Sequence, residues 1–223
     1  VEVIGNATIG RTVLKAIRPD LTIPEVRSVA EWKLFSKISK TGASWEKPGI
    51  GWLPKFCREV DMTKERPKFL GKEAQGTMPL VEGRMVQAHR FGVKGHVSGT
   101  GRRACWEAYP IGGSQISPQF WLHADDIPKS NQGRVQKLRI GFCDIAGQTN
   151  ERSLMATLIP PGVVCGNKVP TILFPEDSTE DRLLVWMAIA NSFVFDWMLR
   201  RVLTTTVNYF LLQSVPLPKI ANK

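Results

Sequence analysis

The sequence lacks the cysteine pattern of a disulfide-stabilised or zinc-binding protein. Its four cysteines are widely spaced and include no C-x-x-C pair; they are Cys57, Cys105, Cys143 and Cys165. Disulfide frameworks and structural zinc sites both need cysteines that are grouped or regularly spaced. We therefore expect all four to be small, buried apolar side chains.

Long apolar runs are also missing, and so is a targeting signal. No stretch approaches the roughly 20 consecutive apolar residues that cross a bilayer, and the first residues lack the basic-then-apolar order of a secretory signal. These features predict a soluble protein of the cytoplasm with no membrane partner. The chain runs from Val1 to Lys223 without a recognisable tail, so we expect a piece excised from a longer protein.

Histidine is scarce, and the one basic glycine-rich turn is an incomplete phosphate motif. His89, His96 and His123 show no metal-ligand spacing with one another. The turn at 99–103, GTGRR, lacks the Lys-Ser/Thr pair of a phosphate loop. It remains either a loop that contacts phosphate or a plain surface turn. We expect no metal and no cofactor in this chain.

Positive charge is what the sequence has in excess. It contains 30 Lys and Arg against 20 Asp and Glu, which gives a formal net charge of +10. Cations that neutralise phosphates release condensed counterions, and this release drives salt-dependent binding to nucleic acid. The charge balance therefore indicates a polyanionic partner, although a basic structural or protein-interaction domain would have the same composition.

The pattern of apolar residues predicts an α+β fold, with a mixed or antiparallel sheet and packed helices. Short apolar runs separated by glycine and proline turns fill 78–169, and we expect strands at 137–145 and 153–159. Apolar residues then recur at helical spacing, which predicts one long C-terminal helix at about 179–203. Ser178 with Asp181 resembles a capping box at its start.

The ends of the chain are less regular. We expect a loop near Lys47–Pro48–Gly49. The three β-branched residues Thr204–Thr206 should end the long helix, and a short strand is expected at 208–212. Within the helix, Asn191 and Ser192 form a polar pair, and we predict a structural role for Asn191 through buried hydrogen bonds.

One catalytic pattern must be weighed. Pro19–Asp20 followed by Glu31–Trp32–Lys33 fits PD…ExK, in which two carboxylates hold Mg²⁺ and the lysine supports an attacking water. A nuclease of this kind places the carboxylates on adjacent strands, and the residues between them, with Pro24 and charged neighbours, fit such a hairpin poorly. The pattern is short enough to arise by chance, so a Mg²⁺-dependent nuclease using Asp20, Glu31 and Lys33 is the alternative hypothesis.

Four segments in one order carry a resemblance to a known family. They are PLVEGRMV at 79–86 with HR at 89–90, RIGFCDIA at 139–146 with TNERS at 149–153, IPPG at 159–162 with GNK at 166–168, and ANSFVFD at 190–196 followed by Arg200, Asn208 and PLP at 216–218. Together they resemble the region that follows the catalytic domain in type IIG-like restriction-modification adenine-specific DNA methyltransferases of bacteria. Val81, Cys143 and Thr204–Thr206 depart from the family's usual residues.

The resemblance implies a target-recognition region that binds double-stranded DNA. The parent enzyme would use S-adenosylmethionine, bound by a catalytic domain of the same chain. An amino-directed methyltransferase needs Asp or Asn before Pro-Pro and an aromatic residue after it, and neither IPPG at 159–162 nor the glycines Gly5 and Gly10 supply the catalytic or cofactor motif. We therefore expect no enzymatic activity from this chain alone.

In this interpretation 56–223 is the DNA target-recognition domain, and 1–55 is the tail of the catalytic domain or a subdomain. Arg and Lys would fix register against phosphates, while Arg or Asn side chains would reach base edges. We predict a DNA-contacting corner around Arg200 and Arg201. The complete set of expected DNA-binding residues is Arg84, His89, Arg90, Lys94, Arg102, Arg103, Arg152, Asn167, Lys168, Arg200, Arg201, Thr206 and Asn208.

Overall fold

The chain forms two compact units that combine helices with mostly antiparallel strands, so the fold is of the α+β class, as expected. The computed structural model describes residues 2–4, 7–43, 45, 52–147, 149–177 and 179–219. Unit 1 comprises Val1–Pro54, Ala146–Ser153 and Ser192–Lys223, and unit 2 comprises Lys55–Ile145 and Leu154–Asn191. The expected domain boundary after residue 55 stays a prediction.

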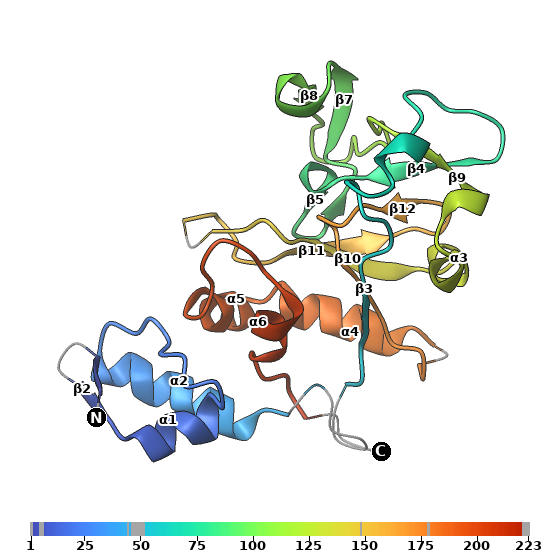
Figure 1. The fold of residues 1–223 in the computed structure, drawn as a ribbon. Coiled ribbons are helices and arrows are strands. Elements are labelled where there is room, and N and C mark those ends of the chain that lie inside the picture. The colour runs from blue at the N-terminus through green and yellow to red at the C-terminus, as the bar shows by residue number, and fades with distance from the viewer. Residues whose placement is uncertain are drawn as a thin grey trace. The chain divides into compact units, whose positions relative to one another are not determined.

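Unit 2 contains most of the strands (Figure 1). They are β3 Lys55–Cys57, β4 Thr77–Val81, β5 Val86–Gln87, β6 Arg90–Phe91, β7 Lys94–Ser98, β8 Cys105–Ala108, β9 Trp121–His123, β10 Arg139–Cys143, β11 Met155–Ile159, β12 Val164–Cys165 and β13 Thr171–Leu173. A four-stranded antiparallel sheet has the order β11-β10-β13-β3, and a three-stranded mixed sheet has the order β12-β4-β9. Strands β5–β6 and β7–β8 form two-stranded ribbons.

Strand β10 is the centre of the larger sheet. All five of its residues are buried, as in strands covered on both faces. Gly141 permits the close approach of β11, since a Cβ there would lie 2.6 Å from Ile159 Cγ1. The strands expected at 137–145 and 153–159 are confirmed as β10 and β11, with narrower bounds.

Helices complete unit 2. They are α3 Lys129–Val135 and α4 Asp181–Ala190, together with the 3-10 turns η1 Arg66–Lys68, η2 Gly83–Met85, η3 Gly101–Arg103 and η4 Ala124–Asp126. Helix α4 packs against β10 and β11 and buries Leu183 and Trp186. Removing these large apolar side chains from water is the main term that holds the helix to the sheet.

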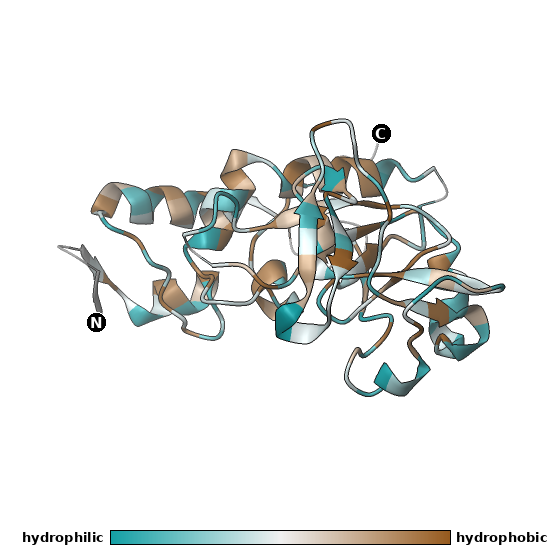
Figure 2. Cartoon of the chain, turned by 90° about the horizontal axis from the view of Figure 1, so that it is seen from above, coloured by the Kyte–Doolittle hydropathy of each residue, from teal (hydrophilic) through white to brown (hydrophobic). Residues whose placement is uncertain are grey.

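Unit 1 is mainly helical. Its elements are β1 Glu2–Ile4, β2 Ala7–Ile9, α1 Arg11–Ile17, α2 Val29–Thr41, α5 Phe193–Arg200 and α6 Tyr209–Gln213. Ser28 caps α2 by accepting a hydrogen bond from the Glu31 N–H. Along α2 hydrophobic and hydrophilic residues alternate (Figure 2), which is typical of a helix with one face on a core.

The C-terminal segment of unit 1 is joined to the end of α2. Ala43 and Leu217 exchange backbone hydrogen bonds of 2.7 and 3.2 Å. The Trp45 indole N–H donates to Val215 O at 2.6 Å, and the Trp45 ring lies against Phe195 with centroids 6.5 Å apart. Residues close to the C-terminus therefore complete the core of the N-terminal helices.

The prediction of one long helix at about 179–203 is wrong. It is interrupted at Asn191–Ser192, giving α4 and α5. Ser192 has an extended backbone, with φ −73° and ψ 155°, and its hydroxyl accepts from the Phe195 N–H at 3.2 Å. The serine thus starts a new helix as its N-cap, which competes with continued helix.

The outcome of the remaining structural predictions differs from one to the next. The prediction of a strand at 208–212 is wrong, because this segment forms helix α6, capped by the Asn208 side chain. Cys143 and Cys165 are buried as expected, Cys57 is half-buried, and Cys105 is exposed on β8. The loop at 47–49 and the capping residue Ser178 lie outside the described residues.

No single helix in the described ranges has the length and apolar character to cross a membrane, and only the broken pair α4 and α5 together meets those criteria.

Candidate nucleic-acid interface

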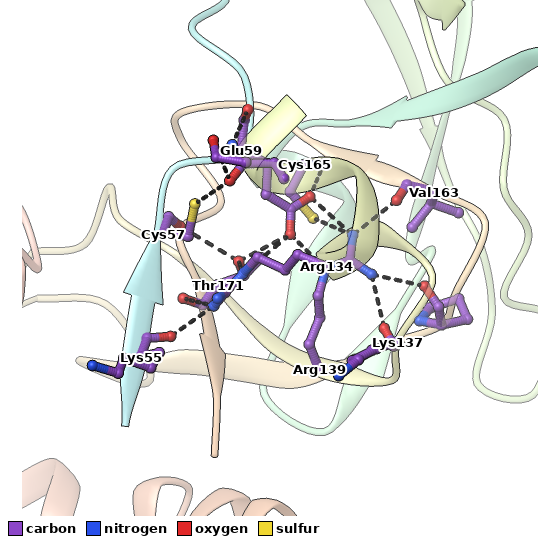
Figure 3. A network of polar contacts seen from close by, with 12 residues as sticks. Lys55, Cys57, Glu59, Arg134, Lys137, Arg139, Val163, Cys165 and Thr171 are labelled. Atoms are coloured by element: carbon purple, nitrogen blue, oxygen red, sulfur yellow. Dashed lines mark hydrogen bonds and ion pairs between the residues drawn. The ribbon is translucent and has the colours of Figure 1, made fainter. Parts of the chain in front are cut away.

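A buried ionic network fixes the framework of unit 2 (Figure 3). Glu59 and Arg139 are both fully buried, and the carboxylate accepts from Arg139 Nε at 2.5 Å and Nη2 at 2.9 Å. Glu59 also accepts from the Cys165 N–H at 2.8 Å and the Thr171 hydroxyl at 2.9 Å. Such bidentate arginine–carboxylate pairs are directional as well as strong, so this one fixes the positions of β10, β12 and β13 around Glu59, which lies two residues after β3.

A second arginine supports the same carboxylate. Arg134 of α3 lies 3.8 Å from Glu59 and donates to the Thr171 hydroxyl, to Thr171 O and to Lys55 O. The network joins α3 to β3 and β13, as Figure 3 shows. The polar groups of these residues bond to one another, so we assign the residues to the framework that supports the surface.

The β7–β8 ribbon presents exposed basic residues at its tip. Arg102 and Arg103 lie in η3, between the two strands, and both are exposed. The tip is shaped by Gly99, whose φ is +75° and whose Cβ, if present, would lie 2.4 Å from Arg103 O. Only glycine accepts this combination without strain. The sequence prediction of a basic glycine turn at 99–103 therefore corresponds to a defined loop.

Two side chains contact the backbone of that tip, one from β7 itself and one from the segment before β9. Gln119 Nε2 donates to Gly99 O at 3.0 Å, and His96 Nε2 lies 2.8 Å from the same oxygen. The register shifts between His96 and Ser98, which places a bulge just before the turn. A bulge increases local twist and redirects side chains, so the orientation of the tip is fixed by the fold.

A stack of cationic and aromatic groups lies at the base of the ribbon. The Arg84 guanidinium lies 4.8 Å from the centre of the Trp106 ring, and His96 contacts that ring edge-on at 5.4 Å. Arg84 keeps 44% of its side chain exposed. Burial raises the pKa of Glu82, while the positive charges of Arg84, His96 and Arg66 act against this rise.

Three further predicted residues lie near these strands in sequence. Lys94 is half-buried on β7. Arg90 donates to Tyr109 O and Pro110 O, so it braces the segment after β8. His89 is exposed in the β5–β6 turn with φ +63°, and its N–H donates to Ala156 O. Arg90 is thus held within unit 2, whereas the His89 ring faces solvent.

A second basic cluster is centred on Asp144. This carboxylate is 1% exposed, and it pairs with Arg58 Nη1 at 3.0 Å and with Lys168 Nζ at 3.7 Å. Arg58 also donates to Asn167 O. The two cations keep 37% and 49% of their side chains exposed. A buried acid therefore orients two half-exposed cations. Arg58 and Asp144 were not among the expected residues, because the sequence does not show which acid pairs with which cation.

The predicted residues of unit 1 have intramolecular partners. Arg200 donates to Asn150 O and Glu151 O and pairs with Asp196 at 3.0 Å. Arg201 pairs with Glu31 at 3.3 Å and lies 4.8 Å over the Trp197 ring. These contacts give both arginines a structural role, and the DNA-contacting corner stays a prediction.

The other three predicted residues of unit 1 are placed as follows. Arg152 lies 4.3 Å over the Phe193 ring. The side-chain oxygen of Asn208 accepts a hydrogen bond from the Leu211 N–H at 2.9 Å, so Asn208 is the N-cap of α6. Thr206 is half-buried in the segment between α5 and α6. Within the part of the chain that the structure describes, no hydrogen bond or ion pair joins these three residues into one site.

The residues of the nuclease hypothesis do not form its expected geometry. Asp20 lies in a turn after α1 and accepts from Arg18 and Thr22, while Glu31 and Lys33 lie on helix α2. Two carboxylates on adjacent strands, which the pattern requires, are thus not formed by Asp20 and Glu31. Within the described ranges, no three acidic, histidine or cysteine side chains are grouped so as to hold a metal ion.

Comparison with known proteins adds no family assignment. Neither the protein-family models nor the curated protein sequences give a match to this chain.

Proposed function

We propose that this chain is a sequence-specific duplex DNA recognition module of a restriction-modification adenine methyltransferase. The observation that carries the proposal is the β7–β8 ribbon, with Arg102 and Arg103 exposed at a defined tip. The major groove of B-DNA admits a two-stranded β-ribbon, and arginine is the commonest side chain that reads guanine there. In this function the tip enters the groove.

Other groups would contact the DNA backbone. Arg84 is oriented by the Trp106 ring, and Arg58 and Lys168 are oriented by Asp144. Cations held in place lose less side-chain entropy on binding phosphate, so such contacts position the module at low cost. The net charge of +10 favours the encounter with DNA at long range.

The methyltransferase part of the proposal is supported by the sequence resemblance at 79–90, 139–153, 159–168 and 190–218. Catalysis and S-adenosylmethionine binding would belong to a catalytic domain outside these residues, in a cytoplasmic enzyme. Reading the coding sequence upstream of Val1 tests this directly. An in-frame Asn-Pro-Pro-Tyr motif is expected, and an upstream region without any such motif would contradict the methyltransferase assignment.

DNA binding is tested with a fluorescent random-sequence duplex, by anisotropy at several salt concentrations. The Arg102→Ala/Arg103→Ala variant should bind more weakly and lower the slope of log K against log salt by about 2, as expected for two lost phosphate or base contacts. Selection from a randomised duplex library should then yield a consensus with the wild type and a weaker or altered one with the variant.

A matched control removes the same charge elsewhere in unit 2. Lys129 and Lys137 are exposed, on α3 and just after it, and Figure 1 shows α3 well separated from the β7–β8 ribbon. Lys129→Ala/Lys137→Ala should change the slope by much less than the ribbon variant. Equal effects of the two double variants would mean that binding follows net charge alone, and the ribbon would then not be the recognition element.

A further inference from the structure

Unit 1 contains a cavity that the proposed DNA contacts do not use. Its volume is about 510 Å³, and it lies between the end of α1, the end of α2 and the segment from α6 to Pro216. This volume lies within the range of small-molecule sites. The lining residues that matter here are Arg18, Asp20, Ser39, Trp45, Phe210 and Pro216.

Arg18 is the unusual residue of this cavity. Its side chain is 2% exposed, and its Nη2 donates to Asp20 Oδ2 at 3.1 Å. Its Nε and Nη1 are buried and have no hydrogen-bond partner among the described residues. Arginine is almost never fully buried unless it is paired. Buried donors without acceptors carry a desolvation penalty, so Arg18 retains donors that an acceptor in the cavity would satisfy.

Asp20 compensates the charge of Arg18 only in part. Asp20 also accepts from Thr22 N–H at 3.2 Å and from the Thr22 hydroxyl at 2.5 Å, and 23% of its side chain is exposed. Its negative charge is therefore shared with Thr22 and water. Burial lowers the pKa of Arg18, and Asp20 acts against that change.

The rest of the cavity wall is mixed, with polar residues such as Ser39 and Ser214 beside an apolar part. Phe210 is 59% exposed and lines the cavity from α6. Trp45 also lines the cavity but is buried, and its indole N–H is bonded to Val215 O. Ala43 and Pro216 add further apolar surface. The site thus combines the guanidinium of Arg18 with a wall that is apolar on the side of Phe210 and Pro216.

We infer that this cavity binds a small organic anion, with its carboxylate or phosphate on Arg18 and its apolar body against Phe210 and Pro216. Planar anions suit the site because a guanidinium offers parallel donors to two oxygens. The inference is independent of DNA recognition, since none of the ribbon residues takes part.

Calorimetry with small probes tests the inference on the full chain. Benzoate and phenyl phosphate should each bind saturably at one site, and their relative affinities decide between a carboxylate and a phosphate. Acetate and inorganic phosphate should bind more weakly because they lack the apolar body, and benzyl alcohol should bind more weakly because it lacks the charge. Wild-type protein that binds none of these probes saturably, or binds benzyl alcohol as well as benzoate, would overturn the inference.

Variants connect binding to the named residues. Arg18→Met should weaken benzoate binding about tenfold to a hundredfold, as expected for a lost hydrogen bond to a charged group. Phe210→Ala, at an exposed position that should not disturb folding, should weaken it about threefold to tenfold. Lys15→Ala, on the exposed face of α1, is the matched charge control and should leave the affinity within about twofold.

The outcomes remain decisive if Arg18→Met fails to fold. In that case Arg18→Lys keeps the charge but loses the planar fork, and it should still bind benzoate about tenfold more weakly. Wild-type affinity in folded Arg18→Met or Arg18→Lys protein, or in Phe210→Ala protein, would refute this cavity as the binding site. Release of benzoate by duplex DNA would assign the cavity to a DNA phosphate and would also refute it.

Discussion

The pair of Glu59 and Arg139 allows a sharp test of how unit 2 is held together. Neither side chain is exposed, and two hydrogen bonds join them. Removing one partner of a buried pair leaves the other charge uncompensated, at a cost of about 3–5 kcal/mol. Glu59→Gln and Arg139→Met should each lower the free energy of unfolding by about this amount.

The double variant carries more information than either single one. Glu59→Gln/Arg139→Met removes both charges of the pair, so neither remains as an uncompensated buried ion, although Arg134 still loses its ion pair with Glu59. Its cost does not fall to zero, because Arg139 also donates to the carbonyls of Lys137, Pro160 and Val163, and an orphaned buried acceptor costs roughly 1–3 kcal/mol. The loss should nevertheless be smaller than the sum of the single losses by about 2 kcal/mol or more.

Urea unfolding of the four proteins, followed by tryptophan fluorescence and circular dichroism, measures these differences. Thr171→Val is a useful reference, since it removes no charge: it takes away a neutral donor to Glu59 and an acceptor of Arg134 Nε, and it should cost about 1–3 kcal/mol. Strictly additive losses in the double variant, or a Glu59→Gln loss no larger than that of Thr171→Val, would refute the view that this pair is the central constraint of unit 2.

Three further predictions concern residues whose roles the structure separates. Asn191→Ala should lower the free energy of unfolding by about 1–3 kcal/mol, because the amide donates to Ala156 O and Met187 O; a variant of wild-type stability in urea would reject this structural role. Lys168→Ala should reduce the salt slope of DNA binding by about 1 without loss of stability, and an unchanged slope would remove it from the interface. Arg201→Ala should lower the melting temperature through loss of its Glu31 pair while leaving DNA affinity unchanged; the reverse result in anisotropy and thermal melts would support the predicted DNA-contacting corner.

The parts of the fold that follow local pattern could be predicted from the sequence. Strands β10 and β11 are short, largely apolar runs, and both were expected. The break at Asn191–Ser192 was not, although serine is a preferred N-cap, because apolar residues continue at helical spacing across it. Besides the Ser192 cap, the break is accompanied by a bond from Asn191 to Ala156 O, a contact between residues 35 positions apart that the local pattern does not reveal.

In the candidate interface, too, the sequence does not reveal contacts between residues far apart in the chain. The sequence indicated Arg102 and Arg103 because they follow glycines in a turn, and both are exposed. It did not distinguish them from Arg90 or Arg200, which donate to backbone carbonyls. The sequence shows which residues are charged, whereas the tertiary structure determines which group each charged side chain bonds to.

The assembly of unit 1 from three separate stretches has a consequence for synthesis. The indole of Trp45 bonds to Val215, 170 residues later, and Ala43 pairs with Leu217. On the ribosome, α1 and α2 leave the exit tunnel long before these partners exist, while unit 2 is still being made. Contacts of such long sequence separation form slowly, since a long loop must close first. The nascent N-terminal helices thus have an extended period with apolar faces uncovered, during which chaperones have access to them.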